Sequence, residues 1–541
     1  MNRMYIGLFT AAVAVSSVVF CGCKSDEDFR LERAENAMKH FERSRYRHPD
    51  EGRTFTLRDC IVLAQKNNLE LKVQELEAQV AREQKTADML GMLPEMNIKN
   101  ILTGRSNTAA SSSEKTASDG ATYGYSTSTD RNVNVFSTEL AMSTLDFGLA
   151  FFSTVQANDR ALMREQRLRR TSQNLTLDVV KAYFKVAAAQ RAIRISDKLL
   201  KDCREYTLLI KKLVEARQLD PFVAFDKSRQ FFDMEKRLTA FTRNYRNSCI
   251  ELRAMLGMDP SGTIKVDEAV LNQVPKMEFP SLELLEQIAL LERPELYEAD
   301  IRRHINVVNC RKEIVKMIPS ARLFMDFNNN NNSYLYHASW YSIGVNAAYN
   351  LLKLPQHIAN YAAYSSMAEA EAVKAYSLGV GIMAQVRISH FDMISARERY
   401  QIEDRIYNTY RKKLNSAAAV LGAAQDMTKL ELDHMKLETA EREIARIIAL
   451  GNMYVSYFQV LNSLGVCKID TDSLDVLKNE LAAARLRAES ELARAESRYN
   501  DALVNTSAIK KQDGKAEKKP AGVAHQPLTV LGSSDHVSAG I

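Results

Sequence analysis

The residues whose chemistry is most sharply placed lie at the start of the chain. Arg3 is followed by an almost wholly apolar stretch over residues 5–20, too short to cross a membrane comfortably, as in a secretory signal peptide. The ending Phe20-Cys21-Gly22-Cys23 resembles the bacterial lipobox, in which a small residue precedes the cysteine that is acylated. We expect acylation at Cys23, because bulky Phe20 makes Cys21 the poorer acceptor. The alternative is an ordinary signal peptide in which the cysteines are incidental.

Other reactive residues form no recognisable constellation. The five remaining cysteines are odd in number and widely scattered, which disfavours a disulfide framework and fits small apolar residues inside helices: Cys60, Cys203, Cys249, Cys310 and Cys467. The nine histidines form no ligand cluster, and neither a His-Glu-x-x-His pair nor a Walker loop is present. The net charge of +6 is spread over mixed runs instead of a basic stripe. We therefore expect no enzyme activity, no metal, no cofactor and no nucleic-acid partner.

The elements that make up the chain occur twice. Residues 57–94 align without a gap with residues 282–319, at a constant offset of 225, and each segment reads as an amphipathic helix stopped by a proline. Further along, Leu145-Asp146-Phe147-Gly148 aligns with Leu352-Lys353-Leu354-Pro355, and Leu256-Gly257 aligns with Leu464-Gly465. The sequence therefore predicts two copies of one unit.

Each copy contains a predicted strand hairpin after the proline. Residues 341–351 alternate strictly between apolar and polar, which is the pattern of a membrane barrel strand with one face toward lipid. Residues 136–143 and 322–327 repeat the pattern, and residues 96–102 show it most weakly. The hairpin tips are long and polar, including the asparagine run 328–332, and suit extracellular loops. The alternative is a soluble hairpin with one buried face.

Very long helices follow the hairpins. Residues 147–218 contain no proline, which allows one helix of about 100 Å. Coiled-coil spacing appears within it (Leu199, Cys203, Tyr206, Ile210, Leu213) and in its return helix (Phe231, Met234, Leu238, Phe241, Tyr245, Cys249, Leu252). The predicted turns lie at Asp220-Pro221 and near residues 422–428. A plain structural rod is the alternative to a channel wall.

The order of helix, proline, strand hairpin, long helical hairpin and Leu-Gly, given twice, resembles the TolC-like outer-membrane efflux family over residues 55–465. Phe55-Thr56-Leu57, Asn67-Asn68-Leu69-Glu70-Leu71 and Leu93-Pro94 look like its first helix. Two departures concern the connections between elements: Ala216 replaces the glycine expected at the first helical turn, and Pro355 stands where the first copy has Gly148 at its strand-to-helix junction.

The resemblance implies a mainly α protein with a membrane β-barrel portion. Each two-repeat protomer would supply long antiparallel coiled helices and four transmembrane strands to a homotrimer, with a twelve-stranded barrel above an α-helical tunnel. Open sheet edges are not tolerated in lipid, which independently requires several chains. The expected function is a passive outer-membrane conduit of a multi-component efflux or secretion system, working with a periplasmic adaptor and an inner-membrane pump in a Gram-negative bacterium. A lipid-anchored coiled-coil scaffold and a type I protein-secretion duct are the alternatives.

The expected organisation has six parts: 1–22 lipoprotein signal peptide, 23–54 anchor segment, 55–257 first repeat, 258–281 linker, 282–465 second repeat, and 466–541 C-terminal helix with a disordered tail. A ring of like charges at the tunnel mouth could filter or gate. Asp220 and Asp426, near the two turns, are the candidates, although solvated turn residues are the plainer interpretation.

Overall fold

The computed structural model describes residues 24–45, 52–112, 124–274, 278–420, 426–466, 479–495 and 497–498, without the side chains of 43–45, 420 and 426–430. The expected signal peptide, Cys23 and the end of the C-terminal tail lie outside these residues. The chain forms two compact units, Met1–Ala484 and Arg485–Ile541. In the second unit, residues 485–495 and 497–498 are helical. The first unit carries all the elements named below.

The first unit passes twice through one order of elements: a pair of short helices, two strands, a long helix and its return helix. The first passage comprises α3 (Leu57–Asn67), α4 (Leu69–Leu90), β2 (Glu95–Gly104), β5 (Asn132–Ser143), α5 (Thr144–Glu215) and α6 (Pro221–Met255). The second comprises α7 (Leu282–Glu292), α8 (Pro294–Lys316), β7 (Ser320–Asn330), β8 (Ser339–Ala348), α9 (Leu354–Val420) and α10 (Asp426–Leu464).

Smaller elements fill the connections. They are α2 (Asp26–Arg45), β1 (Thr54–Phe55), β3 (Ala109–Ser111), β4 (Ser126–Thr129), β6 (Lys265–Val266), and the 3-10 turns η1 (Ala269–Asn272) and η2 (Leu351–Lys353).

The helix that precedes each hairpin is broken in two, where the sequence predicts one continuous helix. At Asn68 the backbone turns to φ −66°, ψ 123°, and the side-chain amide oxygen accepts a hydrogen bond from the backbone N–H of Leu71 as the N-cap of α4. At Arg293 the backbone adopts φ −72°, ψ 119°, because Pro294 at the first position of α8 disfavours helical geometry in the residue before it.

Four strands form one antiparallel sheet in the order β2-β5-β7-β8. The register pairs Met96 with Leu140, Leu140 with Met325, and Met325 with Ile343. Side chains of directly paired residues point to the same side of a sheet, so the alternating apolar residues of all four strands share one face. The weakly patterned strand predicted over 96–102 is therefore confirmed as part of this sheet.

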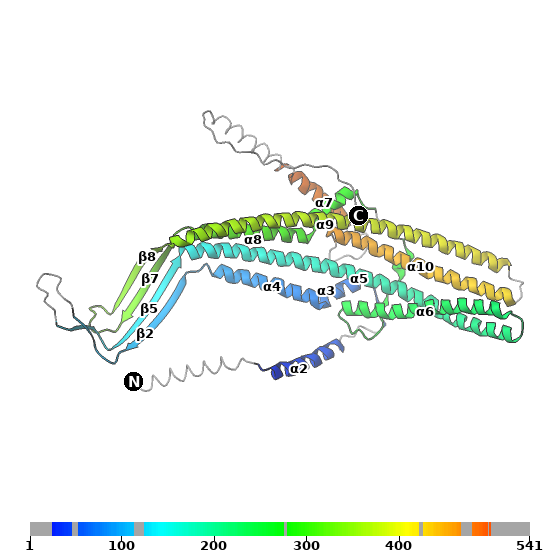
Figure 1. The fold of residues 1–541 in the computed structure, drawn as a ribbon, viewed down its shortest axis with the longest axis horizontal. Coiled ribbons are helices and arrows are strands. Elements are labelled where there is room, and N and C mark those ends of the chain that lie inside the picture. Colours follow the sequence, from blue (N-terminus) through cyan, green and yellow to red (C-terminus); the bar gives the residue numbers. More distant parts are fainter. Residues whose placement is uncertain are drawn as a thin grey trace, which may run out of the picture. The chain divides into compact units, whose positions relative to one another are not determined.

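Four helices continue the four strands in the same order. α4 packs against α5, α5 against α8, and α8 against α9, and Figure 1 shows the strands at one end of this layer. β5 passes directly into α5, where the Ser143 hydroxyl accepts a hydrogen bond from the backbone N–H of Asp146. α5 has 72 residues, or about 108 Å of helix, as the proline-free run predicts.

The lower parts of the long helices bury the predicted coiled-coil seam. Leu199, Cys203, Ile210 and Leu213 of α5 pack with Phe231, Met234 and Leu238 of α6, joined by Leu437 and Ile444 of α10. The segment Glu431–Leu464 of α10 is long and apolar enough to cross a membrane, but its most apolar window is 67% buried within the fold. Such burial is typical of a core helix.

A small two-stranded sheet lies against α5 near the middle of that helix. β1 pairs in parallel with β6, and the Asp267 N–H donates to the Phe55 carbonyl at 2.9 Å. The Tyr183 hydroxyl of α5 donates to the Asp267 carbonyl at 2.7 Å. These bonds fix the start of the first repeat at the level of Tyr183.

Candidate functional site

The two faces of the sheet differ in polarity. The apolar face exposes large side chains in the single chain: Met96, Ile98, Leu102, Phe136, Leu140, Met142, Leu323, Met325, Tyr341, Ile343 and Val345. Ile343 is 80% exposed and Tyr341 72%, far above what a buried sheet face shows. On the opposite face Arg322 pairs with Glu139 at 3.0 Å, and Asp326 lies across from Ser342. A sheet with one exposed apolar face and one charged face suits a wall between lipid and water.

Aromatic and aliphatic side chains mark the two ends of this apolar face. Beyond the outer end, Tyr334 and Tyr336 are exposed, Tyr336 at 95%. At the helix end, Leu93, Ile318 and Leu352 are exposed just outside the strands. Tyrosine and tryptophan favour the membrane–water interface, so the first group has the chemistry of an interfacial girdle.

The asparagine run is part of an ordered tip, not only a loop. β7 continues through Asn330, and Asn332 is 8% exposed. The Asn332 amide donates to the Ser128 carbonyl at 2.9 Å, and its oxygen accepts from the Asp130 N–H at 3.1 Å. The Asp130 carboxylate accepts in turn from Ser333. These bonds tie the tip of the second hairpin to the base of the first hairpin's extension, β3 and β4.

Both edges of the wall are open within the described residues. β2 and β8 are the outer strands, each with one side unpaired. Below them, α4 exposes Leu69, Val73, Leu76 and Val80 at spacings of four and three, on the side opposite the buried residues that face α5. α9 exposes Ile358, Tyr376 and Val380. An open sheet edge and an apolar helix edge on both sides describe an incomplete wall that needs a neighbour.

The first candidate gating residue lies at the tip of the first helical hairpin. Asp220 is the N-cap of α6, and its carboxylate accepts from the Phe222 N–H at 2.7 Å. The left-handed backbone conformation, which glycine favours, is adopted by Arg217 with a φ of 55°, directly after Ala216. Asp426 is the first residue of α10, and its side chain lies outside the description. These two aspartates stand at the starts of α6 and α10, and Figure 1 shows those helix ends far from the strands. The joint action of the two aspartates stays a prediction.

Two phenylalanines at the same tip were not singled out from the sequence. Phe222 is 84% exposed and Phe225 71%. The heptad spacing could have predicted their exposure. Both phenylalanines fall outside the seam positions that bury Ala224 and Phe231, so the heptad pattern places them on the surface. The tip therefore presents aromatic surface beside Asp220.

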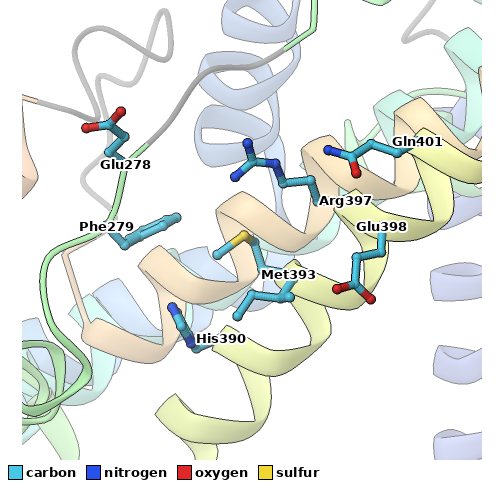
Figure 2. A pocket seen from close by; sticks show the side chains of 8 residues that line it. Glu278, Phe279, His390, Met393, Arg397, Glu398 and Gln401 are labelled. Carbon is cyan, nitrogen blue, oxygen red and sulfur yellow. The ribbon is translucent and has the colours of Figure 1, made fainter.

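The described residues also include an open cavity and two buried thiols. An open cavity of about 540 Å³ lies between α9 and the segment before α7, and Figure 2 shows Phe279 pointing toward Met393 across it. Among the described residues no group of three or more His, Cys, Asp or Glu side chains is placed to hold a metal. Burial raises the pKa of the Cys60 thiol to about 12 and that of Cys203 to about 11, which keeps both protonated.

Comparison with known proteins agrees with this geometry. Residues 60–258 match the family model of the outer membrane efflux protein. The open state of the Neisseria gonorrhoeae MtrE outer-membrane channel has a TM-score of 0.58 at 15% identity, covering 76% of this chain and 88% of that one. The outer-membrane channel OprN gives 0.57 at 15%, covering 76% and 89%. VceC from Vibrio cholerae gives 0.56 at 12%, covering 76% and 96%. No curated protein sequence matches the chain. At these identities the structures show a shared fold.

Proposed function

We propose that this chain, which carries an outer membrane efflux protein domain over residues 60–258 and the fold of the outer-membrane efflux channels, is one protomer of such a channel. Three copies would close a twelve-stranded barrel in the outer membrane and an α-helical tunnel beneath it. The tunnel would conduct small molecules passively from an inner-membrane pump to the exterior, without catalysis.

The observation that carries the proposal is the pair of open edges on a two-faced wall. β2 and β8 each present an unpaired side, and they run in opposite directions because every neighbouring pair in the sheet is antiparallel. β8 of one copy can therefore pair antiparallel with β2 of the next. Closure of this kind removes every open edge from lipid and puts the charged face with Glu139 and Arg322 inside.

The position of the helix ends indicates which kind of partner the protein would bind. α5 reaches about 108 Å from the strands, far beyond an outer membrane, so the tips with Asp220 and Phe222 would stand in the periplasm. Exposed aromatic side chains at such a tip suit contact with another protein, and we assign this role to a periplasmic adaptor that connects to the pump. Asp220 and Asp426 would act at the tunnel mouth.

The anchor would be Cys23, acylated after removal of residues 1–22. Several acyl chains give lasting attachment, because each buried methylene contributes about 0.8 kcal/mol. Cys23→Ser should leave a folded protein that no longer incorporates palmitate. Labelling of the variant at the wild-type level would move the assignment to Cys21.

Mass measurement in detergent, together with conductance in planar bilayers, tests the channel itself. We expect a trimer that conducts ions. A stable monomer would contradict the architecture, because four strands are too few to enclose a lumen. A trimer that never conducts, even with its tips opened by substitution, would instead identify a lipid-anchored scaffold.

A further inference from the structure

The single tryptophan of the chain lies on the charged face of the sheet. The register pairs Trp340 of β8 directly with Asn328 of β7, and Asp326 lies two residues from Asn328 along that strand. Directly paired residues, and residues two apart in one strand, point to the same side of a sheet. Trp340 therefore shares the face of Asp326 and points away from the face of its neighbour Tyr341. In a closed barrel the charged face lines the lumen, so this inference rests on the proposed function.

Trp340 is accessible on this face. The residue is 40% exposed in the single chain, although it lies within the paired part of β8. An aromatic residue that serves the membrane interface faces lipid, and the sheet carries such residues on its apolar face, where the rings of Phe327 and Tyr341 lie 5.0 Å apart. The interior of a membrane barrel is usually polar. Trp340 therefore offers an indole ring to molecules that pass through the lumen.

A second aromatic ring covers the wall between Asp326 and the helix end of the strands. Phe324 pairs directly with Gly344 and lies on the same face as Asp326. Its ring lies over the glycine, because a Cβ atom at position 344 would overlap the Cζ and Cε1 atoms of the ring. The ring therefore extends along the sheet and not into the lumen. Next to Asp326 the wall is flat and apolar.

The carboxylate beside Trp340 is not neutralised by a cation. Asp326 accepts a hydrogen bond from the side-chain amide of Asn328 at 2.9 Å. Arg322, four residues away along β7, pairs instead with Glu139 at 3.0 Å. Lys99 points to the same face from β2, two strands away from β7. Within the described part of the chain Asp326 takes part in no ion pair, so its charge faces the lumen uncompensated.

Trp340 and Asp326 are close enough to contact one ligand. They are diagonal neighbours across an antiparallel pair, because Asn328 faces Trp340 and Asp326 lies two residues further along β7. Diagonal neighbours are about 7 to 8 Å apart, within reach of long side chains. A cation is attracted to the face of an indole ring within about 6 Å of its centroid. A cation over the Trp340 ring would therefore also interact with the Asp326 carboxylate.

We propose that Trp340 and Asp326 form a selectivity site for organic cations in the barrel lumen, one on each of the three chains. The indole ring contacts the aromatic or apolar body of the passing cation, Asp326 supplies the opposite charge, and Phe324 continues the apolar wall. The site favours cations that carry an aromatic ring over anions and over small hydrated cations. Binding is weak and transient, because a conducting channel has to release what it binds.

The single tryptophan makes the surroundings of the site measurable. Trimer in lipid nanodiscs contains one indole per chain, so its fluorescence reports Trp340 alone. Lipid with brominated acyl chains quenches indole fluorescence from the membrane, and the water-soluble cation N-benzylpyridinium quenches it by contact from the aqueous side. We expect quenching by N-benzylpyridinium and none by brominated lipid. Quenching by the lipid would place Trp340 against the membrane and overturn the site.

Matched aspartate variants measure the contribution of charge. Asp326→Asn should lower the quenching constant of N-benzylpyridinium about threefold, the effect of one charge at about 7 Å in water, and leave quenching by neutral acrylamide unchanged. Asp392→Asn is the control, since Asp392 is exposed on α9, 38 residues or about 57 Å beyond Leu354. Equal losses in the two variants, or for the two quenchers, would remove Asp326 from the site.

Block of the potassium current in planar bilayers measures the contribution of the ring. N-benzylpyridinium should reduce the current of wild type, Trp340→Ala should weaken its apparent affinity about two- to fivefold, and Trp340→Phe should retain most of it. Equal block of wild type and Trp340→Ala would overturn the role of the ring. A stable monomer would overturn the channel and the site together, whereas a conducting trimer without these effects would overturn the site alone.

Discussion

Asn68 and Arg293 occupy equivalent places in the two passages of the chain. They are 225 positions apart, each ends a short helix and begins a longer one, and their backbones agree within about ten degrees at φ −66°, ψ 123° and φ −72°, ψ 119°. The two residues hold this geometry differently. Asn68 bonds locally to the Leu71 N–H at 2.9 Å. Arg293, 4% exposed, donates to the Ser463 carbonyl at 3.1 Å and to Gln385 at 2.8 Å.

Arg293→Ala should therefore cost much more stability than Asn68→Ala. Burial, with repulsion from Arg170, lowers the pKa of Arg293 to about 10, so the guanidinium is still charged at neutral pH and its removal leaves buried acceptors unpaired. We expect a loss of about 3 kcal/mol or more, against about 0.5 to 2 kcal/mol for the lost helix cap at Asn68. The thermal unfolding temperatures of the two purified variants measure this difference in stability. Equal losses would mean that Arg293 acts only as a helix break.

Neighbouring residues of β8 should respond oppositely to the same charge. Ile343 points to the apolar face in the middle of the strand, and Ser342 points to the charged face opposite Asp326. Arginine on the lipid side near the membrane centre costs about 2 to 4 kcal/mol. Ile343→Arg should therefore deplete trimer from the outer membrane, and Ser342→Arg should insert normally. Membrane fractionation measures this, and normal insertion of both variants would argue against a lipid-facing sheet.

Acid should loosen the contact between α5 and α8 through Glu298. Burial alone would raise the pKa of Glu298, but hydrogen bonds from Arg167 and Arg302 outweigh it and hold the pKa below its ordinary value. A lowered folded-state pKa stabilises the fold above the unfolded value of about 4.3, and this contribution disappears as the pH falls through the folded-state pKa. The melting temperature of wild type should fall more steeply below pH 4.3 than that of Glu298→Gln. Parallel curves would exclude Glu298 as the titrating group.

Sequence patterns predicted the elements that follow a period and missed contacts of single side chains, both local and distant. The heptad through Leu199 and Ile210 predicted the buried seam, because helical spacing alone decides which side faces the return helix. The break at Asn68 was missed, since an asparagine is compatible with a polar helix position until its side chain is seen to cap Leu71. The burial of Arg293 could not be read either, because its acceptor at Ser463 lies 170 residues away. At the tip, the sequence predicted a turn at Asp220 but did not single out the exposed side chain of Phe222.

The last prediction concerns the tunnel mouth. Replacing Asp220 removes both a charge and a helix cap, and the two effects have to be measured separately. Replacing Asp220 and Asp426 by alanine removes two carboxylates per chain, and if these filter ions at the constriction, conductance should rise or cation preference should fall. Asp220→Ala also removes the acceptor for the Phe222 and Val223 N–H groups, which costs about 0.5 to 2 kcal/mol of helix stability.

Asparagine at position 220 keeps a capping oxygen without the charge, so the Asp220→Asn, Asp426→Asn pair is the matched control. We expect it to change ion selectivity in single-channel recordings as much as the alanine pair, with a thermal stability close to that of wild type. Altered conductance in the alanine pair only would assign the effect to a frayed α6 terminus. Wild-type selectivity in both pairs would remove the gating role from these aspartates and leave the channel itself intact.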